Sequence, residues 1–209
     1  MRIRPARPAD REALLAISLA TGDAGGDAAP LHRDGDLIGL IYSAPYLALE
    51  PGSALVAEDE AGVVGFAVGT RDTRAFEARL ERDWWPALRA AHPRPTGDPS
   101  SWDADARRIA RFHAPRVAPV AVVAGHPAHM HLNLLARARG RGLGRRLADA
   151  WLGLCAADGA ADGPIGVHVA VHPANTGALA FWAACGFAPI AAPEALPDAA
   201  TVWLARVAG

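Results

Sequence analysis

The residues best suited to chemistry lie between positions 139 and 146, where arginines alternate with glycines. Glycine permits a tight turn in which several backbone N–H groups point to one centre. The pattern predicts that a helix begins near Gly142, so its unpaired N–H groups and its positive dipole end face the same centre. Such a loop is suited to hold a phosphate or pyrophosphate. Its residues are Arg139, Gly140, Arg141, Gly142, Gly144, Arg145 and Arg146.

Two common phosphate-binding loops do not match this stretch. A P-loop needs Gly, four residues, and then Gly-Lys-Ser or Gly-Lys-Thr, a run that the chain lacks. A dinucleotide-binding loop needs G-x-G-x-x-G after the first strand and an acidic residue about 20 positions later. Here the spacing is G-x-G-x-G, it falls late in the chain, and the next strand offers His168 and His172. The motif that does fit is Arg-x-x-Gly-x-Gly at 139–144.

Polar residues alternate along the strand expected just before this loop. His129, His131 and Asn133 share one face of it, because successive side chains in a strand point to opposite sides. Two interpretations stay open: a proton acceptor, since histidine titrates near neutral pH, or structural hydrogen bonds to neighbouring loops. His126 adds a third nearby histidine, but no carboxylate or cysteine accompanies the group, so no metal site is predicted.

Length and composition predict one globular domain. The chain has 209 residues, 51% of them hydrophobic, and a net charge of −1, which creates no long-range field for nucleic acid or acidic membranes. The start lacks the apolar run of a signal peptide and no stretch is long enough to span a membrane, so a cytoplasmic protein is expected. Cys155 and Cys185 are expected to be buried free thiols.

Hydrophobic periodicity predicts an alternation of strands and helices. Residues 71–116 are long for a connection and are interpreted as a helical and proline-rich elaboration of the domain. The expected strands are 2–7, Ala54–Glu58, Gly62–Gly69, Met130–Leu135, Ile165–Val171, Phe187–Ile190 and Thr201–Val207. The first expected helix begins at Pro8, and the others are Leu37–Tyr42, Phe76–Leu88, Asp103–Phe112, Gly142–Ala157 and Asn175–Cys185.

Two of these motifs resemble the GNAT family of N-acetyltransferases. The run 139–144, placed after a strand and before a helix, is similar to the family's acetyl-CoA pyrophosphate loop. Downstream, Asn175 is followed by Ala178, Phe181-Trp182 and Gly186-Phe187, which resembles the family's second signature. The resemblance implies a single GNAT domain over 1–209: an α/β fold of the α+β type, with a mixed sheet splayed open between the strands at 130–135 and 165–171 and helices on both faces.

The resemblance also implies how acetyl-CoA is held. Backbone groups of Leu134, Leu135 and Ala136 are expected to bind the pantetheine arm as an added strand does, with the Leu134 N–H near the acetyl oxygen. Arg139, Gly140, Arg141, Gly142, Gly144 and Arg145 are the expected pyrophosphate contacts, and Asn175 and Trp182 are expected beside the pantetheine. Catalytic roles are expected for His129, His131 and Leu134.

The usual family residue at the Trp182 position is tyrosine, whose hydroxyl can return a proton to the thiolate of CoA. An indole N–H is only a hydrogen-bond donor, so this step is left to another group or to water. Trp182 is interpreted mainly as a packing residue with an incidental contact to the cofactor.

The N-terminal half resembles a narrower group, the bacterial relatives of the acetyltransferase-like C-terminal domain of O-GlcNAcase. That resemblance rests on the segments Ile3–Ala6, Thr21–Gly25, Ala44–Tyr46, Gly69–Thr73, Trp84–Pro86 and Pro127–His131.

The function implied is acetyl transfer from acetyl-CoA to a primary amine in a ternary complex. The acceptor is expected to be a small-molecule or protein amine, with no nucleic-acid or membrane partner and a possible homodimer. The alternative is a catalytically weak or inactive acetyl-CoA-binding module used for sensing or interaction. Six further residues are candidates for an acceptor pocket but are interpreted as core rather than site: Tyr42, Tyr46, Asp72, Trp84, Trp85 and Trp102.

Overall fold

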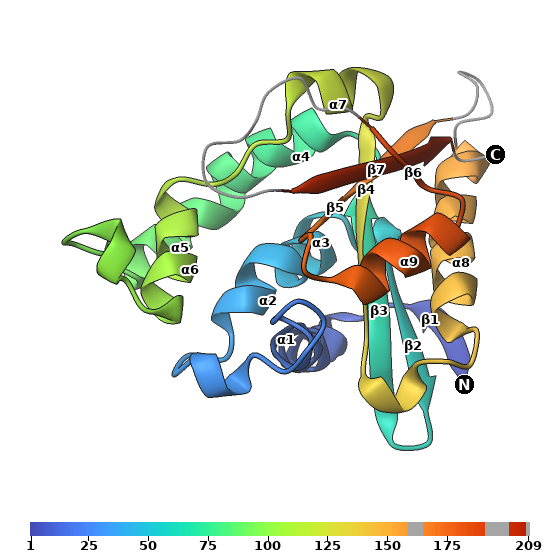
Figure 1. Ribbon diagram of the computed structural model, residues 1–209, viewed down its shortest axis with the longest axis horizontal. Coiled ribbons are helices and arrows are strands. Elements are labelled where there is room, and N and C mark those ends of the chain that lie inside the picture. The colour runs from blue at the N-terminus through green and yellow to red at the C-terminus, as the bar shows by residue number, and fades with distance from the viewer. Residues whose placement is uncertain (159–164, 191–200, 208–209) are drawn as a thin grey trace.

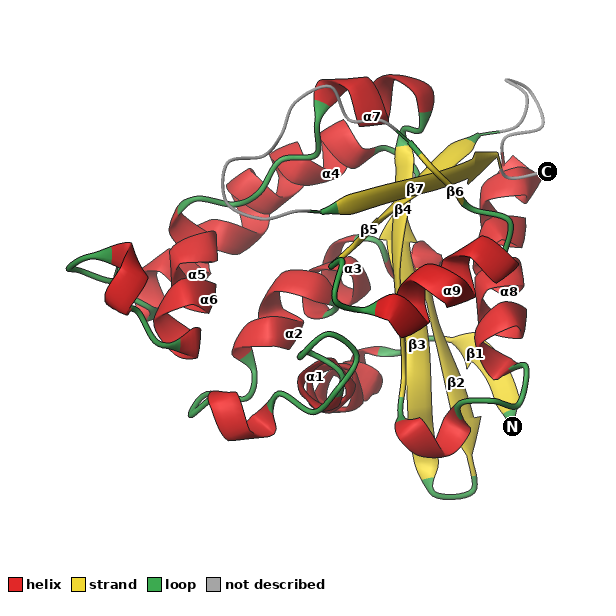
Figure 2. Cartoon of the chain, viewed as in Figure 1, coloured by secondary structure: helices red, strands yellow, loops and turns green. Residues whose placement is uncertain are grey.

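A mixed β-sheet with helices on both faces forms the centre of the computed structural model, which describes residues 1–158, 165–190 and 201–207 (Figures 1 and 2). The seven strands are ordered β1-β2-β3-β4-β5-β7-β6. Neighbours run antiparallel except for the parallel pair β4 and β5. The expected mixed sheet with helices on both faces is confirmed.

The strands and helices follow the hydrophobic periodicity at most positions. The strands are β1 (Arg2–Pro5), β2 (Ala54–Asp59), β3 (Gly62–Thr70), β4 (Ala128–Leu134), β5 (Gly166–Val171), β6 (Ala188–Pro189) and β7 (Val202–Val207). The helices are α1 (Arg11–Ala20), α2 (Leu37–Tyr42), α3 (Ala44–Leu49), α4 (Thr73–Arg79), α5 (Trp85–Ala91), α6 (Ala104–His113), α7 (Val120–Gly125), α8 (Leu143–Asp158) and α9 (Thr176–Ala184).

Strands β4 and β5 pair over a short distance and then part. On its other side, β4 pairs with β3 from Thr70–His129 to Gly65–Leu134. With β5 its register covers Ala128–Val167 and His129–His168 and stops there. Figure 1 shows β5 and β7 turned away from the direction of β2–β4. The predicted splay is therefore present, and in the described part of the chain no strand pairs with the rest of the β4 edge that faces β5.

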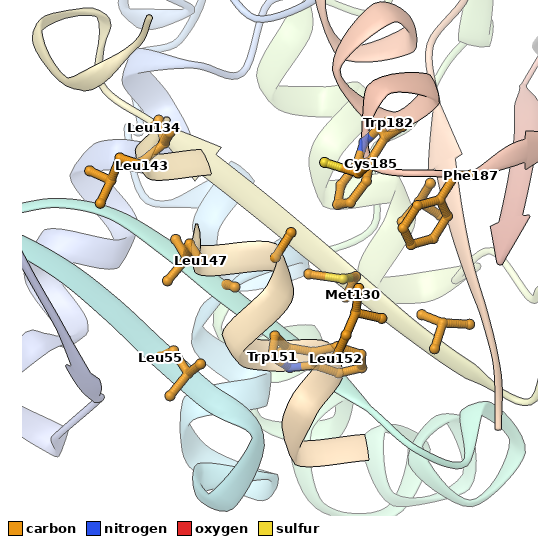
Figure 3. Packing of buried hydrophobic residues seen from close by; sticks show 14 of the residues in the cluster. Leu55, Met130, Leu134, Leu143, Leu147, Trp151, Leu152, Trp182, Cys185 and Phe187 are labelled. Carbon is orange, nitrogen blue, oxygen red and sulfur yellow. The ribbon is translucent and has the colours of Figure 1, made fainter. Parts of the chain in front are cut away.

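Each face of the sheet has its own hydrophobic core. On β2, Leu55 and Ala57 point to the side covered by α8 and α9, while Ala54 and Val56 point to the side of α1–α6. Figure 3 shows the first core, in which Trp151 of α8 lies near Leu152 and Leu55. The Trp151 indole N–H donates to the Ser53 carbonyl at 2.8 Å. The two thiols, Cys155 and Cys185, are buried in this core as expected.

The helix predicted at Leu37–Tyr42 is confirmed as α2, whereas another predicted helix is divided and two helices were not predicted. Pro45 stands in the first turn of one of these two, α3, where its missing N–H costs nothing. The single helix predicted at Phe76–Leu88 is instead α4, a π-helical segment at Leu80–Trp84, and α5 with Pro86 in its first turn. Helix α7 was not predicted at all.

Two glycines provide a matched test of this packing. A Cβ on Gly69 would lie 2.2 Å from the His129 carbonyl oxygen and 2.4 Å from the Trp151 ring, whereas one on Gly153 of α8 would meet nothing within 4 Å. We expect Gly69→Ala to lower the free energy of unfolding by about 1–3 kcal/mol through overpacking. Gly153→Ala should raise it by about 0.5–1 kcal/mol because alanine favours the helix. Urea denaturation measures both, and equal effects would contradict the described contact between β3, β4 and α8.

Candidate functional site

The parting of β4 and β5 opens into a cavity of about 680 Å³. Its walls include residues 129–133 of β4, 168–171 of β5 and the loop 21–24 after α1. At the far end it reaches α4, α6 and the segment 115–118. The cavity thus joins the open edge of the sheet to the helices of the elaborated segment.

The glycine loop has the backbone that an anion-binding turn requires. Gly140 and Gly142 lie in the left-handed region, at φ 72° and 71°, which side chains with a Cβ rarely adopt. Helix α8 begins directly afterwards, at Leu143. Gly144 serves packing instead, because a Cβ there would lie 2.9 Å from the Phe181 ring. The loop itself is exposed and lies beyond the lining of the cavity.

The loop arginines do not all point the same way. The Arg139 guanidinium donates to the carbonyls of Leu134 at 3.0 Å and of Gly25 at 2.9 Å, which ties the end of β4 to the loop after α1. The Arg145 side chain hydrogen-bonds to the Ala184 carbonyl at the end of α9, away from the turn. Arg141 is exposed beside Gly142. The geometry therefore brings backbone amides to the turn and gives the arginines separate positions around it.

The amide of Leu134 points toward the open side of β4. The next amide, Leu135 N–H, donates to the Val64 carbonyl on the β3 side at 2.9 Å. Because successive amides in a strand point to opposite edges, the Leu134 N–H faces the edge that β5 has left. Ala136 follows in a short turn at Ala136–Ala138. This is the position in which a fixed amide dipole can polarise a ligand carbonyl.

Asn175 and Trp182 both line the cavity, and both also have structural roles. The Asn175 side chain caps α9 by accepting from Ala178 N–H at 3.0 Å. The Trp182 ring packs between Phe181 and Phe187, with centroids 4.9 Å from each, and is 5% exposed. The packing interpretation of Trp182 therefore fits its surroundings.

A chain of hydrogen bonds links the two histidines of β4 to α3 and α4. The Tyr46 hydroxyl lies 2.7 Å from His129 Nε2 and 3.1 Å from His131 Nε2. His129 Nδ1 lies 2.8 Å from the Thr73 hydroxyl, which is 2.6 Å from the Pro127 carbonyl. We call these four side chains the histidine relay: Thr73, His129, Tyr46 and His131.

The end of the relay fixes the direction of every proton in it. A carbonyl only accepts, so Thr73 donates to Pro127 and must accept from His129 Nδ1–H. His129 Nε2 then accepts from the Tyr46 hydroxyl, whose oxygen accepts from His131 Nε2–H. Neutral imidazole carries one N–H, so His131 Nδ1 is left as an acceptor. The hydrogen-bond pattern thus assigns His131 as the member of the relay with a basic nitrogen to spare.

Burial keeps these imidazoles neutral. Loss of hydration lowers the pKa of His129 well below its usual value, and nearby His131 and His168 lower it further. The same cause, with His168 adding to it, lowers the pKa of His131 to about 4. His168 is shifted to a pKa of about 4, again mainly by burial, although it donates from Nδ1 to the His126 carbonyl at 2.7 Å. At neutral pH all three are therefore uncharged, and within the relay only His131 has a nitrogen left to act as a base.

The sequence interpretation missed several residues of the site. Tyr42, Tyr46 and Trp85 line the cavity, although they were interpreted as core. Both descriptions hold for Tyr46, which is 5% exposed and stacks on Phe76 at 4.4 Å while its hydroxyl joins the relay. Asp72, Trp84 and Trp102 lie outside the lining. The sequence did contain one indication that Tyr46 matters: it ends Ala44–Tyr46, one of the segments that carry the narrower resemblance.

The described parts of the chain contain neither a metal-ligand cluster nor a membrane-spanning helix. No three histidine, cysteine, aspartate or glutamate side chains there converge on a point where a metal ion could bind. In the same ranges, no helix combines the length and the hydropathy needed to cross a bilayer.

Comparisons with known proteins agree with this geometry. The solved structure of SsHAT matches with a TM-score of 0.87 and 35% identity, covering 100% of this chain and 98% of that one. A GNAT superfamily phosphinothricin acetyltransferase from Sinorhizobium meliloti, solved in complex with AcCoA, shares the fold with a TM-score of 0.53 and 16% identity, covering 100% of this chain and 88% of that one. No protein-family model matches the chain.

The chain belongs to the GNAT family of acetyltransferases, as its whole-length likeness to SsHAT and its fold show. Within that family the narrower resemblance is confirmed as well: the chain is 25% identical over 195 residues to protein O-GlcNAcase of Rattus norvegicus. That match covers 93% of this chain and 21% of the relative, so the chain spans about a fifth of the length of the curated relatives it matches.

The neutral histidines make stability depend on pH. The unfolded chain binds protons on these imidazoles below about pH 6.5, whereas the folded chain resists protonation of His131 and His168 down to about pH 4. The free energy of unfolding should therefore rise with pH across this window. His131→Asn should reduce the slope by up to about 1.4 kcal/mol per pH unit, the contribution of one proton.

Urea titrations at several pH values measure this slope. Gly153→Ala, which changes no titratable group, is the control and should keep the wild-type slope. An unchanged slope in His131→Asn would show that His131 is not held neutral by the fold.

Proposed function

We propose that the chain is an acetyl-CoA-dependent N-acetyltransferase that moves an acetyl group directly to a primary amine. The observation that carries this proposal is the coincidence of two features on β4. The strand leaves an unpaired backbone edge beside the cavity, and its histidines present a neutral base to the same cavity. The glycine loop with left-handed backbone follows the strand directly.

The residues present fit acetyl-CoA. A pantetheine arm needs an unpaired strand edge. The Leu134 N–H faces that edge, whereas the Leu135 N–H is already bonded to the β3 side, so Leu135 and Ala136 would contact the arm through other atoms. A diphosphate needs convergent amides, which the turn at 139–144 and the start of α8 supply. Asn175 and Trp182 line the cavity between these two regions. The complex of the Sinorhizobium meliloti enzyme with AcCoA supports the same cofactor here. When bound, acetyl-CoA supplies an acetyl group activated as a thioester.

The chain contributes positioning, a dipole and a base. The Leu134 N–H is directed at the oxygen on which negative charge develops. The amine loses one proton as its nitrogen forms the bond to the acetyl carbon and the carbon–sulfur bond breaks; His131 Nδ1 accepts that proton, and in the net reaction it ends on the released thiol. Tyr46 and His129 spread the charge gained by His131 along the relay.

Direct transfer is favoured over a covalent acetyl-enzyme. A cysteine nucleophile would have to reach the cavity as a thiolate. Cys155 and Cys185 are instead buried in the core on the α8 side, and neither lines the cavity. Burial also raises the pKa of the Cys185 thiol, which keeps it protonated.

A pair of glycine variants tests the cofactor site. Gly142 and Gly62 both have positive φ, 71° and 113°, and both have open space where a Cβ would stand. Gly142→Ala should weaken acetyl-CoA binding about tenfold, because strain of about 1–3 kcal/mol disfavours the turn. Gly62→Ala, in the β2–β3 hairpin, should carry similar strain and leave the affinity unchanged. Isothermal titration calorimetry measures the dissociation constants, and no binding by the wild type would overturn the proposal.

The relay is tested by kinetics. His131→Gln should lower kcat by about 10²–10⁴-fold, the usual contribution of a general base, without changing the dissociation constant of acetyl-CoA. Tyr46→Phe keeps the ring but removes the hydroxyl between the histidines, so it should lower kcat by a smaller factor. Thiol release with a panel of amines measures both. His113→Asn, at a partly exposed histidine of α6 outside the relay, serves as the control. Tight binding of acetyl-CoA without amine-dependent release would instead indicate the inactive binding module.

A further inference from the structure

Arginines line the cavity on the side of α6. They are Arg108 and Arg111 on α6 and Arg116 in the segment that follows. Glu77 of α4 also lines this end, but its carboxylate already pairs with Arg74 at 2.6 Å and accepts from Ala118 N–H at 2.9 Å. The Glu77 carboxylate is therefore already satisfied within the protein.

Arg108 is the best placed of the three. Its guanidinium lies 5.8 Å from the centroid of the Tyr42 ring and 3.5 Å from the Tyr42 hydroxyl. In the ranges that the structure describes, no carboxylate lies within ion-pair distance of it. The half-buried cation is thus held by an aromatic ring, and its ability to pair with an anion is not used by the protein itself.

The helix that carries Arg108 is fixed in place. Asp105, three residues earlier, is buried and accepts from His32 Nδ1 at 2.7 Å and from the Arg33 backbone N–H at 3.1 Å. The Asp103 side chain caps the helix at Ala106. A cation anchored on a capped and tethered helix is a preorganised binding group rather than a solvated surface charge.

The same tyrosine connects Arg108 to the relay. The Tyr42 ring lies edge-on to the His131 ring with the centroids 5.7 Å apart. Because Arg108 Cζ is 5.8 Å from the same Tyr42 centroid, the guanidinium lies within about 12 Å of the His131 imidazole. A small molecule can therefore contact His131 with one end and Arg108 with the other.

We propose that the acetyl acceptor is a small primary amine that carries an anionic group, a carboxylate or a phosphate. The amine lies at His131 and the anion pairs with Arg108. This inference rests on the proposed acetyl transfer and names its substrate class. A lysine in a basic peptide is the competing acceptor, and Arg108 disfavours it by repulsion between like charges.

Matched acceptors test the proposal. The ω-amino carboxylates from glycine through γ-aminobutyrate to ε-aminocaproate are compared with their amides, which differ only in charge at the far end. Aminoethylphosphonate and a lysine-containing basic peptide complete the set, so that carboxylate, phosphonate and cationic acceptors are distinguished. For the best chain length, kcat/KM should favour the anion over its amide by about ten- to a hundredfold, as a charge-assisted hydrogen bond does.

Variants of two neighbouring arginines locate the effect. Arg108→Gln should remove most of the preference for the anion over its amide, because it raises KM for the anionic acceptor. The kinetic constants for the amide should stay within about twofold of wild type. Arg108→Lys should restore part of it, since the charge is kept but the planar fork is lost. Arg107→Gln is the matched control, because Arg107 is exposed on the same helix and does not line the cavity.

A binding measurement separates this inference from the proposed function. Calorimetry with protein saturated with CoA compares N-acetyl-γ-aminobutyrate with its amide and needs no turnover. Tighter binding of the carboxylate, lost in Arg108→Gln, supports the proposal even where no amine is acetylated and the proposed transfer fails. The proposal is overturned if the anion and its amide are used or bound equally well, or if the basic peptide is the preferred acceptor. It is also overturned if Arg108→Gln weakens the use or binding of the anion and of the amide by the same factor.

Discussion

The separation of β4 from β5 after His129 and His168 is the constraint on which the rest of the structure depends. A continuous ladder would pair every amide of β4 and fill the space beside it with side chains. Because the register stops, the Leu134 amide, the end of the histidine relay and the cavity are all available on one strand. The loss of ladder hydrogen bonds is offset on the other edge, where β4 is paired with β3 along its length.

The relay depends on burial in two opposite ways. Removal from water disfavours the imidazolium form, so the histidines rest as neutral groups. The same dry surroundings strengthen each hydrogen bond between them, which fixes which nitrogen carries a proton. The carbonyl of Pro127, a group that can only accept, determines this order from one end. A backbone atom thus sets the tautomer of His131, which is four hydrogen bonds away.

Local periodicity predicted most of the strands and helices, because that information lies within a few residues. The GNAT fold was implied by the resemblance that two short motifs carry, and the positive φ of Gly140 and Gly142 and the cap at Asn175 lie inside those motifs. The relay is different. Tyr46 is 83 residues from His129, and Thr73 is 56 residues from it, so no spacing rule brings them together. The helix predicted at Phe76–Leu88 was wrong for a related reason: whether Pro86 ends one helix or begins another depends on what packs around it. Arg145 was expected to contact a pyrophosphate, but its side chain hydrogen-bonds to the end of α9, a neighbour that its own segment does not reveal.

The two hydrophobic cores divide the molecule's tasks as well as its interior. The glycine loop leads into α8, which packs on one face of the sheet, whereas Tyr42, Tyr46 and Phe76 are held by helices on the opposite face. Substitutions among α2, α4 and α6 therefore change what surrounds the histidines without touching the residues beneath the loop. In evolutionary terms, one half of the domain is free to diversify its choice of partner molecule while the other half stays constant, and a laboratory selection can exploit the same separation.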